Sequence, residues 1–168
     1  TAADYQGEGT AGLMPYLAGT EAAQDSLNIV RAAHKFAAAK ASTTFVDWGH
    51  SEGGQTAMYV EGIAKSYAPD LTLKGVVAGA SPSQFPFIYA ALKTSHFAFY
   101  LLMGAAGLNA WYGNKLAPLS AVLTDTAMKM LPTLSQGCSG AIASLVDPYV
   151  QSGNFAALVK ADPYTCLL

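Results

Sequence analysis

Charged residues are scarce in this sequence. They make up 12% of the 168 residues, and hydrophobic residues make up 52%, whereas an average soluble domain has about 25% charged residues. The formal net charge is -2, so the strong positive field that nucleic-acid binding requires is missing. We therefore expect no nucleic-acid partner. The composition favours a protein that handles lipid, or a part of a larger apolar core.

Long hydrophobic runs and metal-binding patterns are also missing. The stretch 97–114 contains no charged residue, but glycines interrupt it, and its unbroken apolar part is shorter than the roughly 20 residues of a membrane span. The two cysteines, Cys138 and Cys166, lack the spacing of a metal site and allow either one disulfide or two buried thiols. We expect no transmembrane segment and no metal.

The first residues have neither the basic region nor the apolar region of a signal peptide, so the sequence is expected to be a mature form or to lack an N-terminal part. Gly7, Gly9, Gly12 and Pro15 crowd this stretch. They predict a loop that leaves a strand lying upstream of Thr1.

Helix and strand patterns alternate in the first half of the chain. Apolar residues recur at helical spacing after Thr20, a possible N-cap, and predict a helix over 21–39. β-branched and aromatic residues predict a strand over 43–48, and a second apolar strand is predicted over 73–79. A helix over 54–67 separates them. This order predicts a parallel sheet with crossover helices.

The sequence changes character after Gln84. Between Lys74 and Lys115 the only charged residue is Lys93, and aromatic residues are frequent. We interpret this part as an inserted helical subdomain.

Further helical segments follow the insertion. One helix is predicted over 119–131, and short helical turns split by Pro148 and Gly153 are predicted over 145–159. The domain prediction is a core over 1–84 and a helical insertion over 85–168.

Ser51 stands in the pentapeptide Gly49-His50-Ser51-Glu52-Gly53, between the predicted strand and the next helix. A tight strand-to-helix turn can hold a serine hydroxyl toward substrate in a strained backbone conformation. Gly49 and Gly53 are expected to relieve crowding in the turn, and Gly54 gives the helix room to pack close to the strand. A turn that only joins two elements or binds phosphate is the alternative, but the spacing and lysine of a P-loop are missing. The pattern predicts a nucleophile elbow with Ser51 as nucleophile.

Two neighbours of Ser51 bear on this chemistry. The backbone N–H of Glu52 would donate to the substrate carbonyl oxygen as it becomes an oxyanion, helped by the positive end of the helix. We expect the Glu52 side chain to make a structural hydrogen bond. His50 leaves the opposite side of the strand end, and we interpret it as a packing residue and not as the general base.

Several motifs together resemble one enzyme family. They are Asp4-Tyr5-Gln6-Gly7-Glu8-Gly9-Thr10, Pro15-Tyr16, Val30-Arg31-Ala32-Ala33, Gly49-His50-Ser51-Glu52-Gly53-Gly54-Gln55 and Ser66-Tyr67-Ala68-Pro69-Asp70-Leu71. On these motifs the sequence resembles the secretory lipase family, the lipase A type of fungi and bacteria. The likeness is dense over about the first half of the chain and looser over the rest.

The resemblance implies a fold, an activity and a location. The fold class expected is α/β, a partial α/β-hydrolase core of parallel strands with crossover helices plus an inserted helical lid, and Phe85 falls where that lid would begin. The family hydrolyses carboxylic esters, including acylglycerols, without a cofactor, and uses serine, aspartate and histidine in that chain order. The resemblance also implies a secreted or extracytoplasmic protein.

Only Ser51 of the expected triad carries over. The family's aspartate and histidine lie beyond the lid, and its second oxyanion donor lies upstream of Thr1. His96 is the one histidine after Ser51, and it falls inside the lid-like stretch. The later aspartates come in the wrong order for this triad; they are Asp125, Asp147 and Asp162. We expect an internal fragment, inactive alone, whose remaining enzyme could be present as a separate chain.

The cysteines gain an interpretation from the same family. By resemblance, Cys138 forms a disulfide with a partner upstream of Thr1, which leaves Cys166 free or paired elsewhere.

The sequence thus predicts a serine-dependent carboxylic ester hydrolase, a lipase or esterase, that acts through an acyl-enzyme on Ser51. One alternative is a non-catalytic hydrolase-like scaffold that binds apolar ligands or partners through the aromatic segment. Another is a different chemistry on the same fold, such as acyl transfer or peptidase action.

Overall fold

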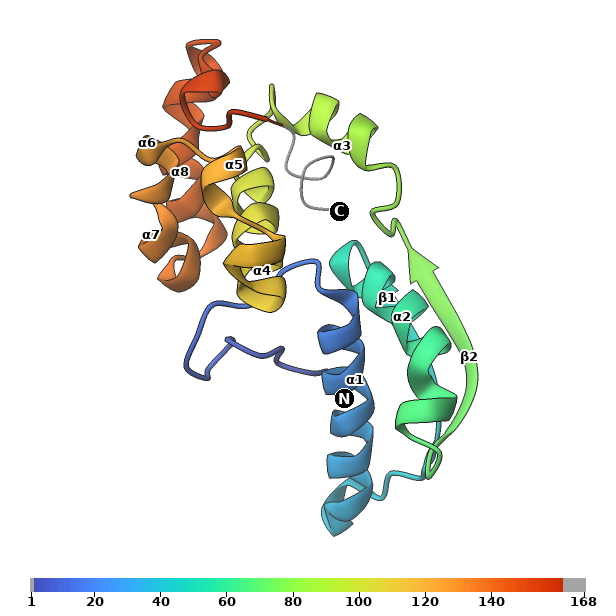
Figure 1. The fold of residues 1–168 in the computed structure, drawn as a ribbon. Helices are drawn as coiled ribbons and strands as arrows, with labels where there is room; N and C mark the ends of the chain where they lie inside the picture. Colours follow the sequence, from blue (N-terminus) through green and yellow to red (C-terminus); the bar gives the residue numbers. More distant parts are fainter. Residues whose placement is uncertain (1, 162–168) are drawn as a thin grey trace. The chain divides into compact units, whose positions relative to one another are not determined.

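The structure is a computed structural model that describes residues 2–161 (Figure 1). The chain divides into two compact units. Within the described residues, the first unit consists of 2–11 and 17–83, and the second consists of 12–16 and 84–161.

The first unit contains a parallel sheet with a crossover helix. Its elements are α1 (Gly19–Lys35), the 3-10 helix η1 (Ala37–Ala39), β1 (Thr44–His50), α2 (Glu52–Tyr67) and β2 (Thr72–Gly79). The two strands pair in parallel from Thr44 opposite Thr72 to His50 opposite Gly79. This arrangement agrees with the predicted order of helix, strand, helix and strand.

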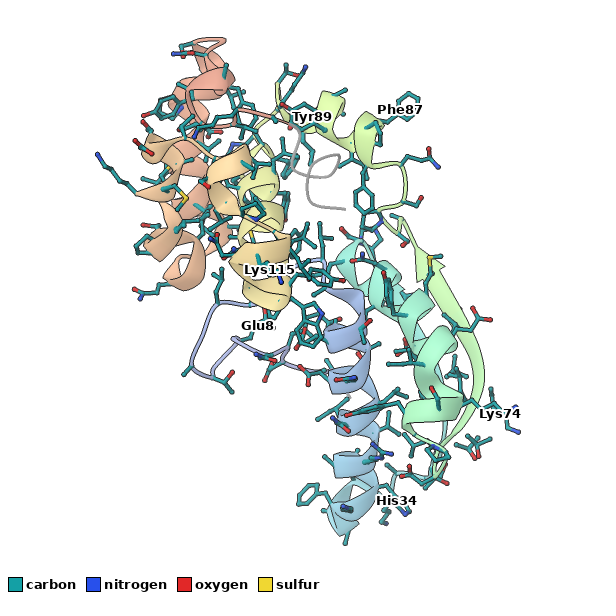
Figure 2. All side chains as sticks on the ribbon, in the orientation of Figure 1. Glu8, His34, Lys74, Phe87, Tyr89 and Lys115 are labelled. Carbon is teal, nitrogen blue, oxygen red and sulfur yellow. The ribbon has the colours of Figure 1, made fainter. Side chains whose placement is uncertain are left out.

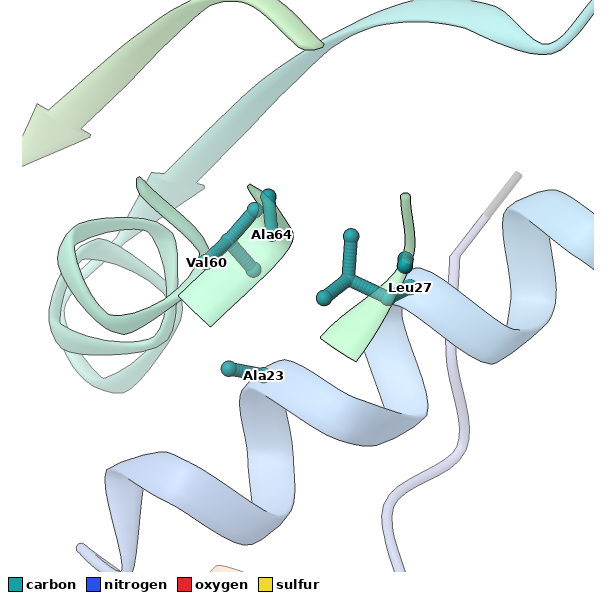
Figure 3. Packing of buried hydrophobic residues seen from close by; sticks show 5 residues of the cluster. Ala23, Leu27, Val60 and Ala64 are labelled. Atoms are coloured by element: carbon teal, nitrogen blue, oxygen red, sulfur yellow. The ribbon is translucent and has the colours of Figure 1, made fainter. Parts of the chain in front are cut away.

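Small and aliphatic side chains form the core of this unit. Ala23 and Leu27 of α1 lie against Val60 and Ala64 of α2, as Figure 3 shows. Leu27 and Val60 have no exposed surface, and each such buried side chain stabilises the fold by about 1.5–3 kcal/mol. Partly buried residues of the strands and their neighbours pack against this cluster; they are Phe45, Ile63, Tyr67, Leu71 and Leu73.

An ion pair joins two of the motifs that carry the family resemblance. Arg31 Nε donates to Asp70 Oδ2 over 2.9 Å, and Arg31 Nη2 donates to the Tyr67 carbonyl over 3.1 Å. The Arg31 guanidinium lowers the pKa of Asp70 to about 2. The side chain therefore links α1 to the turn that follows α2.

The opposite face of the sheet carries exposed apolar side chains. Val46 and Trp48 of β1 are 63% and 72% exposed, and Val77 of β2 is 52% exposed. Trp48 and Val77 are register partners. Alternate residues of β1 thus face the helices and the open side, as the two-residue period of a strand requires.

The first helix begins and ends differently from the prediction. It starts at Gly19, and Ala18 is its N-cap, without a side-chain hydrogen bond. The backbone N–H groups of Glu21 and Ala22 donate to the Ala18 carbonyl, so Thr20 lies inside the helix, and the expected Thr20 cap is wrong. The helix ends at Lys35 because Phe36 adopts an extended conformation.

The described part of the second unit is helical. Its elements are α3 (Phe85–Leu92), α4 (Phe99–Leu116), α5 (Leu119–Val122), α6 (Asp125–Met128), α7 (Leu131–Gln136), α8 (Ser139–Gln151) and the 3-10 helix η2 (Phe155–Ala157). Gly113, at φ 76°, interrupts the regular helical conformation of α4. Within residues 2–161, no helix is long and apolar enough to cross a membrane.

Two expectations for this unit were wrong. The predicted helix over 119–131 is two short helices, α5 and α6, followed by the first residue of α7, because Leu123 is extended and pairs with Val159, and the Thr124 side chain caps α6. Near the end of the unit, α8 runs through Pro148 without a break. A proline removes one backbone donor from a helix, and here the rest of α8 tolerates that loss.

Candidate active site

Ser51 forms the turn between β1 and α2 and is exposed. Its backbone has φ 57° and ψ -119°, a conformation that costs a residue with a side chain about 1–3 kcal/mol unless its surroundings hold it. The N–H of Ser51 donates to the carbonyl of Gly79 over 2.9 Å, and its carbonyl accepts from the N–H of Gln55 over 3.1 Å. Both backbone groups are therefore fixed, one by the neighbouring strand and one by the helix.

The glycines around Ser51 have different roles. A Cβ at Gly49 would collide with the carbonyl of Gly53, and a Cβ at Gly54 would collide with the carbonyl of Gly79. Both positions therefore require glycine, as the pattern predicts. A Cβ at Gly53 would meet no atom of the described residues within 4 Å. The expectation that Gly53 itself relieves crowding is wrong; it is the Gly53 backbone that approaches Gly49.

The loop after β2 closes the same end of the sheet. Ala80, directly after Gly79, has a positive φ of 49°. Next to it, Ser81 Oγ is buried and has no hydrogen-bond partner within residues 2–161. The carboxyl ends of both strands thus lead into residues with a left-handed φ, at the edge where ligands bind in open α/β sheets.

Glu52 is the first residue of α2. Backbone N–H groups in the first turn of a helix have no acceptor inside the helix, so the Glu52 N–H has no acceptor within α2. Burial raises the pKa of the Glu52 carboxyl to about 7, the Leu17 backbone lowers it by a hydrogen bond, and the charge of Glu8 raises it further. Leu17 is thus the partner indicated for the structural hydrogen bond expected of the Glu52 side chain, and that bond stays a prediction.

A second buried carboxyl holds the N-terminal loop. Glu21 is 4% exposed, and its Oε1 accepts from the Gln6 N–H over 3.1 Å, while Asp25 Oδ2 accepts from the same N–H over 2.8 Å. Burial and the neighbouring Asp25 raise the pKa of Glu21 to about 7. The sequence pattern does not indicate this role of Glu21, because Gln6 and Glu21 are fifteen residues apart and such a contact leaves no local pattern.

Within the described residues of the first unit, neither His34 nor His50 is hydrogen-bonded to the Ser51 side chain. His50 is exposed and its ring lies beside Gly79. His34 Nδ1 lies 2.9 Å from the Ala41 carbonyl oxygen. In the second unit, His96 Nδ1 lies 2.8 Å from Asp147 Oδ2.

The other aspartates and cysteines are placed as follows. Asp125 begins α6, and Cys138 is exposed, while Asp162 and Cys166 lie outside the described residues. Among residues 2–161, no group of three or more His, Cys, Asp or Glu side chains could hold a metal ion. The disulfide of Cys138 stays a prediction.

Comparison with known proteins agrees with the motif resemblance. The family model described as Secretory lipase matches residues 1–157. No curated protein and no solved structure matches the chain. Because the family match covers nearly the whole sequence and includes the turn at Ser51, the chain belongs to the secretory lipase family.

Proposed function

We propose that this protein is a serine-dependent carboxylic ester hydrolase in which Ser51 is the nucleophile and is acylated during turnover. The observation that carries the proposal is the backbone of Ser51, a non-glycine residue held at φ 57° between a strand and a helix. Strain of this kind persists where the surroundings enforce it and is concentrated at functional sites. Membership of a lipase family agrees with this chemistry.

The reaction would proceed in two steps. Ser51 Oγ attacks the ester carbonyl carbon as a general base takes its proton, the carbonyl oxygen becomes an oxyanion, and the alcohol leaves with that proton. Water then attacks the acyl-enzyme, and the carboxylic acid leaves as Ser51 regains its proton. The N–H of Glu52 is proposed to donate to the oxyanion in both steps. The triad aspartate and histidine are proposed to come from outside residues 1–168.

The substrate is proposed to be an ester with an apolar acyl chain, such as an acylglycerol. Residues 85–131 support this, because several of their large apolar side chains are exposed. They are Phe87 at 76%, Leu116 at 69%, Phe97 at 54%, Tyr112 at 44% and Trp111 at 37%. We propose that this segment forms a lid or a wall of the substrate channel. No cofactor is required for the proposed reaction, and we propose that the protein is secreted, in agreement with the family name.

A labelling experiment tests the assignment of Ser51. The intact enzyme is treated with a fluorophosphonate probe, and the adduct is located by peptide mapping. The adduct is expected on Ser51, and Ser51→Ala is expected to lose ester hydrolysis. Ser66→Ala serves as a control, because Ser66 is an exposed serine near the last turn of α2 whose hydroxyl donates to the Ile63 carbonyl, and this variant is expected to be labelled normally. Normal turnover by Ser51→Ala would contradict the proposal and favour a non-catalytic or different role.

A further inference from the structure

Leu17 has an unusual backbone for a leucine. It lies two residues before the first residue of α1, is 8% exposed and has a φ of 68°. A side chain in this left-handed region clashes with its own backbone. The conformation therefore needs contacts that hold it in place.

Two side chains from the first turn of α2 lie near the backbone of Leu17. Gln55 Nε2 donates to the Leu17 carbonyl over 3.3 Å, and this hydrogen bond is buried. The Leu17 backbone lies close enough to the Glu52 carboxyl to lower its pKa, against the larger effect of burial. The N–H of Gly19 also donates to the Leu17 carbonyl, over 3.0 Å. The side chain of Glu52 thus lies beside a buried backbone segment that Gln55 holds by a hydrogen bond.

A second chain of hydrogen bonds reaches the main chain of Glu52. Tyr5 Oη donates to Thr56 Oγ1 over 3.1 Å, and Thr56 Oγ1 donates to the Glu52 carbonyl over 3.1 Å. Thr56 is 3% exposed. Hydrogen bonds in such a buried chain polarise and strengthen one another.

Glu52 is therefore constrained on two sides: its carbonyl accepts a hydrogen bond from Thr56, and its side chain lies beside the Leu17 backbone that Gln55 holds. We propose that Tyr5 and Gln55 are positioning residues that fix the main chain of Glu52 and, through it, the direction of the Glu52 N–H at the oxyanion. This inference rests on the proposed function. A preorganised donor costs no reorganisation when the oxyanion forms, so loosening it weakens binding of the transition state more than binding of the substrate.

The test uses two substitutions in the intact enzyme that remove one hydrogen bond each. Tyr5→Phe removes only the hydroxyl, and Gln55→Met removes the donor while keeping the length of the side chain. Each is expected to lower kcat about 5- to 30-fold with KM unchanged, less than the 10²–10³-fold cost of losing an oxyanion donor outright. The affinity for an alkylboronic acid, which mimics the tetrahedral intermediate, should fall by the same factor.

Tyr67→Phe is the matched control. Its hydroxyl accepts from Asn28 Nδ2 over 3.0 Å at the far end of α2, so kcat and boronic-acid affinity should stay at the wild-type level. Unchanged kcat in both Tyr5→Phe and Gln55→Met, or a rise in KM without loss of boronic-acid affinity, would overturn the inference. Ser51→Ala separates the two proposals: if it stays active, the proposed function fails, and if it is inactive while both variants keep full kcat, only the positioning role fails.

Discussion

The backbone N–H of Ser51 lies 2.9 Å from the carbonyl oxygen of Gly79 and donates a hydrogen bond to it. Gly79 is the last residue of β2 and pairs with His50, the last residue of β1. The turn at Ser51 is therefore closed by Gly79 of β2, which is 28 residues further along the chain. Its geometry depends on the complete β1-α2-β2 unit and not on the pentapeptide alone.

The two glycines of the pentapeptide should respond differently to substitution. Gly49→Ala places a Cβ against the Gly53 carbonyl, and we expect it to lower the free energy of unfolding by about 1–3 kcal/mol and to reduce labelling of Ser51 by a fluorophosphonate. Gly53→Ala adds a Cβ into open space and should keep the free energy of unfolding and the labelling of Ser51 at the wild-type level. Denaturant unfolding and labelling rates measure the two effects. Equal damage by both substitutions would show that the turn differs from this description.

Glu21 should make the stability of the protein depend on pH between about 5 and 8. Its pKa is raised from 4.5 to about 7 in the folded protein, so the folded state keeps a proton that the unfolded state loses in this range. The contribution of the protonated Glu21 carboxyl to stability is therefore fully present below pH 4.5 and is lost as pH rises through 7. Burial next to Asp25 is the physical cause.

Glu21→Gln tests this dependence. The glutamine oxygen can still accept from Gln6, and the variant should lose less stability than the wild type between pH 5 and 8, by on the order of 2 kcal/mol. Glu61→Gln, an exposed carboxylate on α2, is the control and should follow the wild-type slope. Urea unfolding at a series of pH values gives the measurement. A Glu21→Gln slope that matches the wild type would refute the prediction.

Phe87 is expected to contact lipid if residues 85–131 form a lid. Phe87 is 76% exposed, and Figure 2 shows its ring pointing away from α3. We expect Phe87→Ser to reduce hydrolysis of an emulsified long-chain acylglycerol about 3- to 10-fold, because burying this ring in lipid contributes about 1.5–3 kcal/mol at most. Hydrolysis of a soluble short-chain ester should not change.

Phe36→Ser is the matched control for Phe87→Ser. Phe36 is 66% exposed and lies in the first unit, so its replacement should leave the ratio of long-chain to short-chain hydrolysis as it is. If Phe87→Ser also leaves this ratio unchanged, the interpretation of the segment as ordinary packing helices is favoured instead.

Local patterns predicted the elements that position Ser51. The β-branched and aromatic run before Gly49 indicated β1, and the helical pattern after Gly53 indicated α2, because both elements have a regular apolar period. The failure at 119–131 has a long-range cause: Leu123 pairs with Val159, and this contact breaks a segment whose own sequence favours a helix. The strained Leu17 and the contact of Tyr5 with Thr56 also join distant parts of the chain. A single sequence without structure does not show such pairs.

The positive φ of Ser51 also affects how this sequence can change in evolution. Glycine adopts this backbone conformation readily, so Ser51→Gly should make the fold more stable by about 1 kcal/mol while removing the hydroxyl. Selection for stability alone would therefore favour loss of the serine. Selection for reactivity would keep a serine at φ 57° despite its cost in stability. A non-catalytic scaffold descended from this chain would be free to replace the serine.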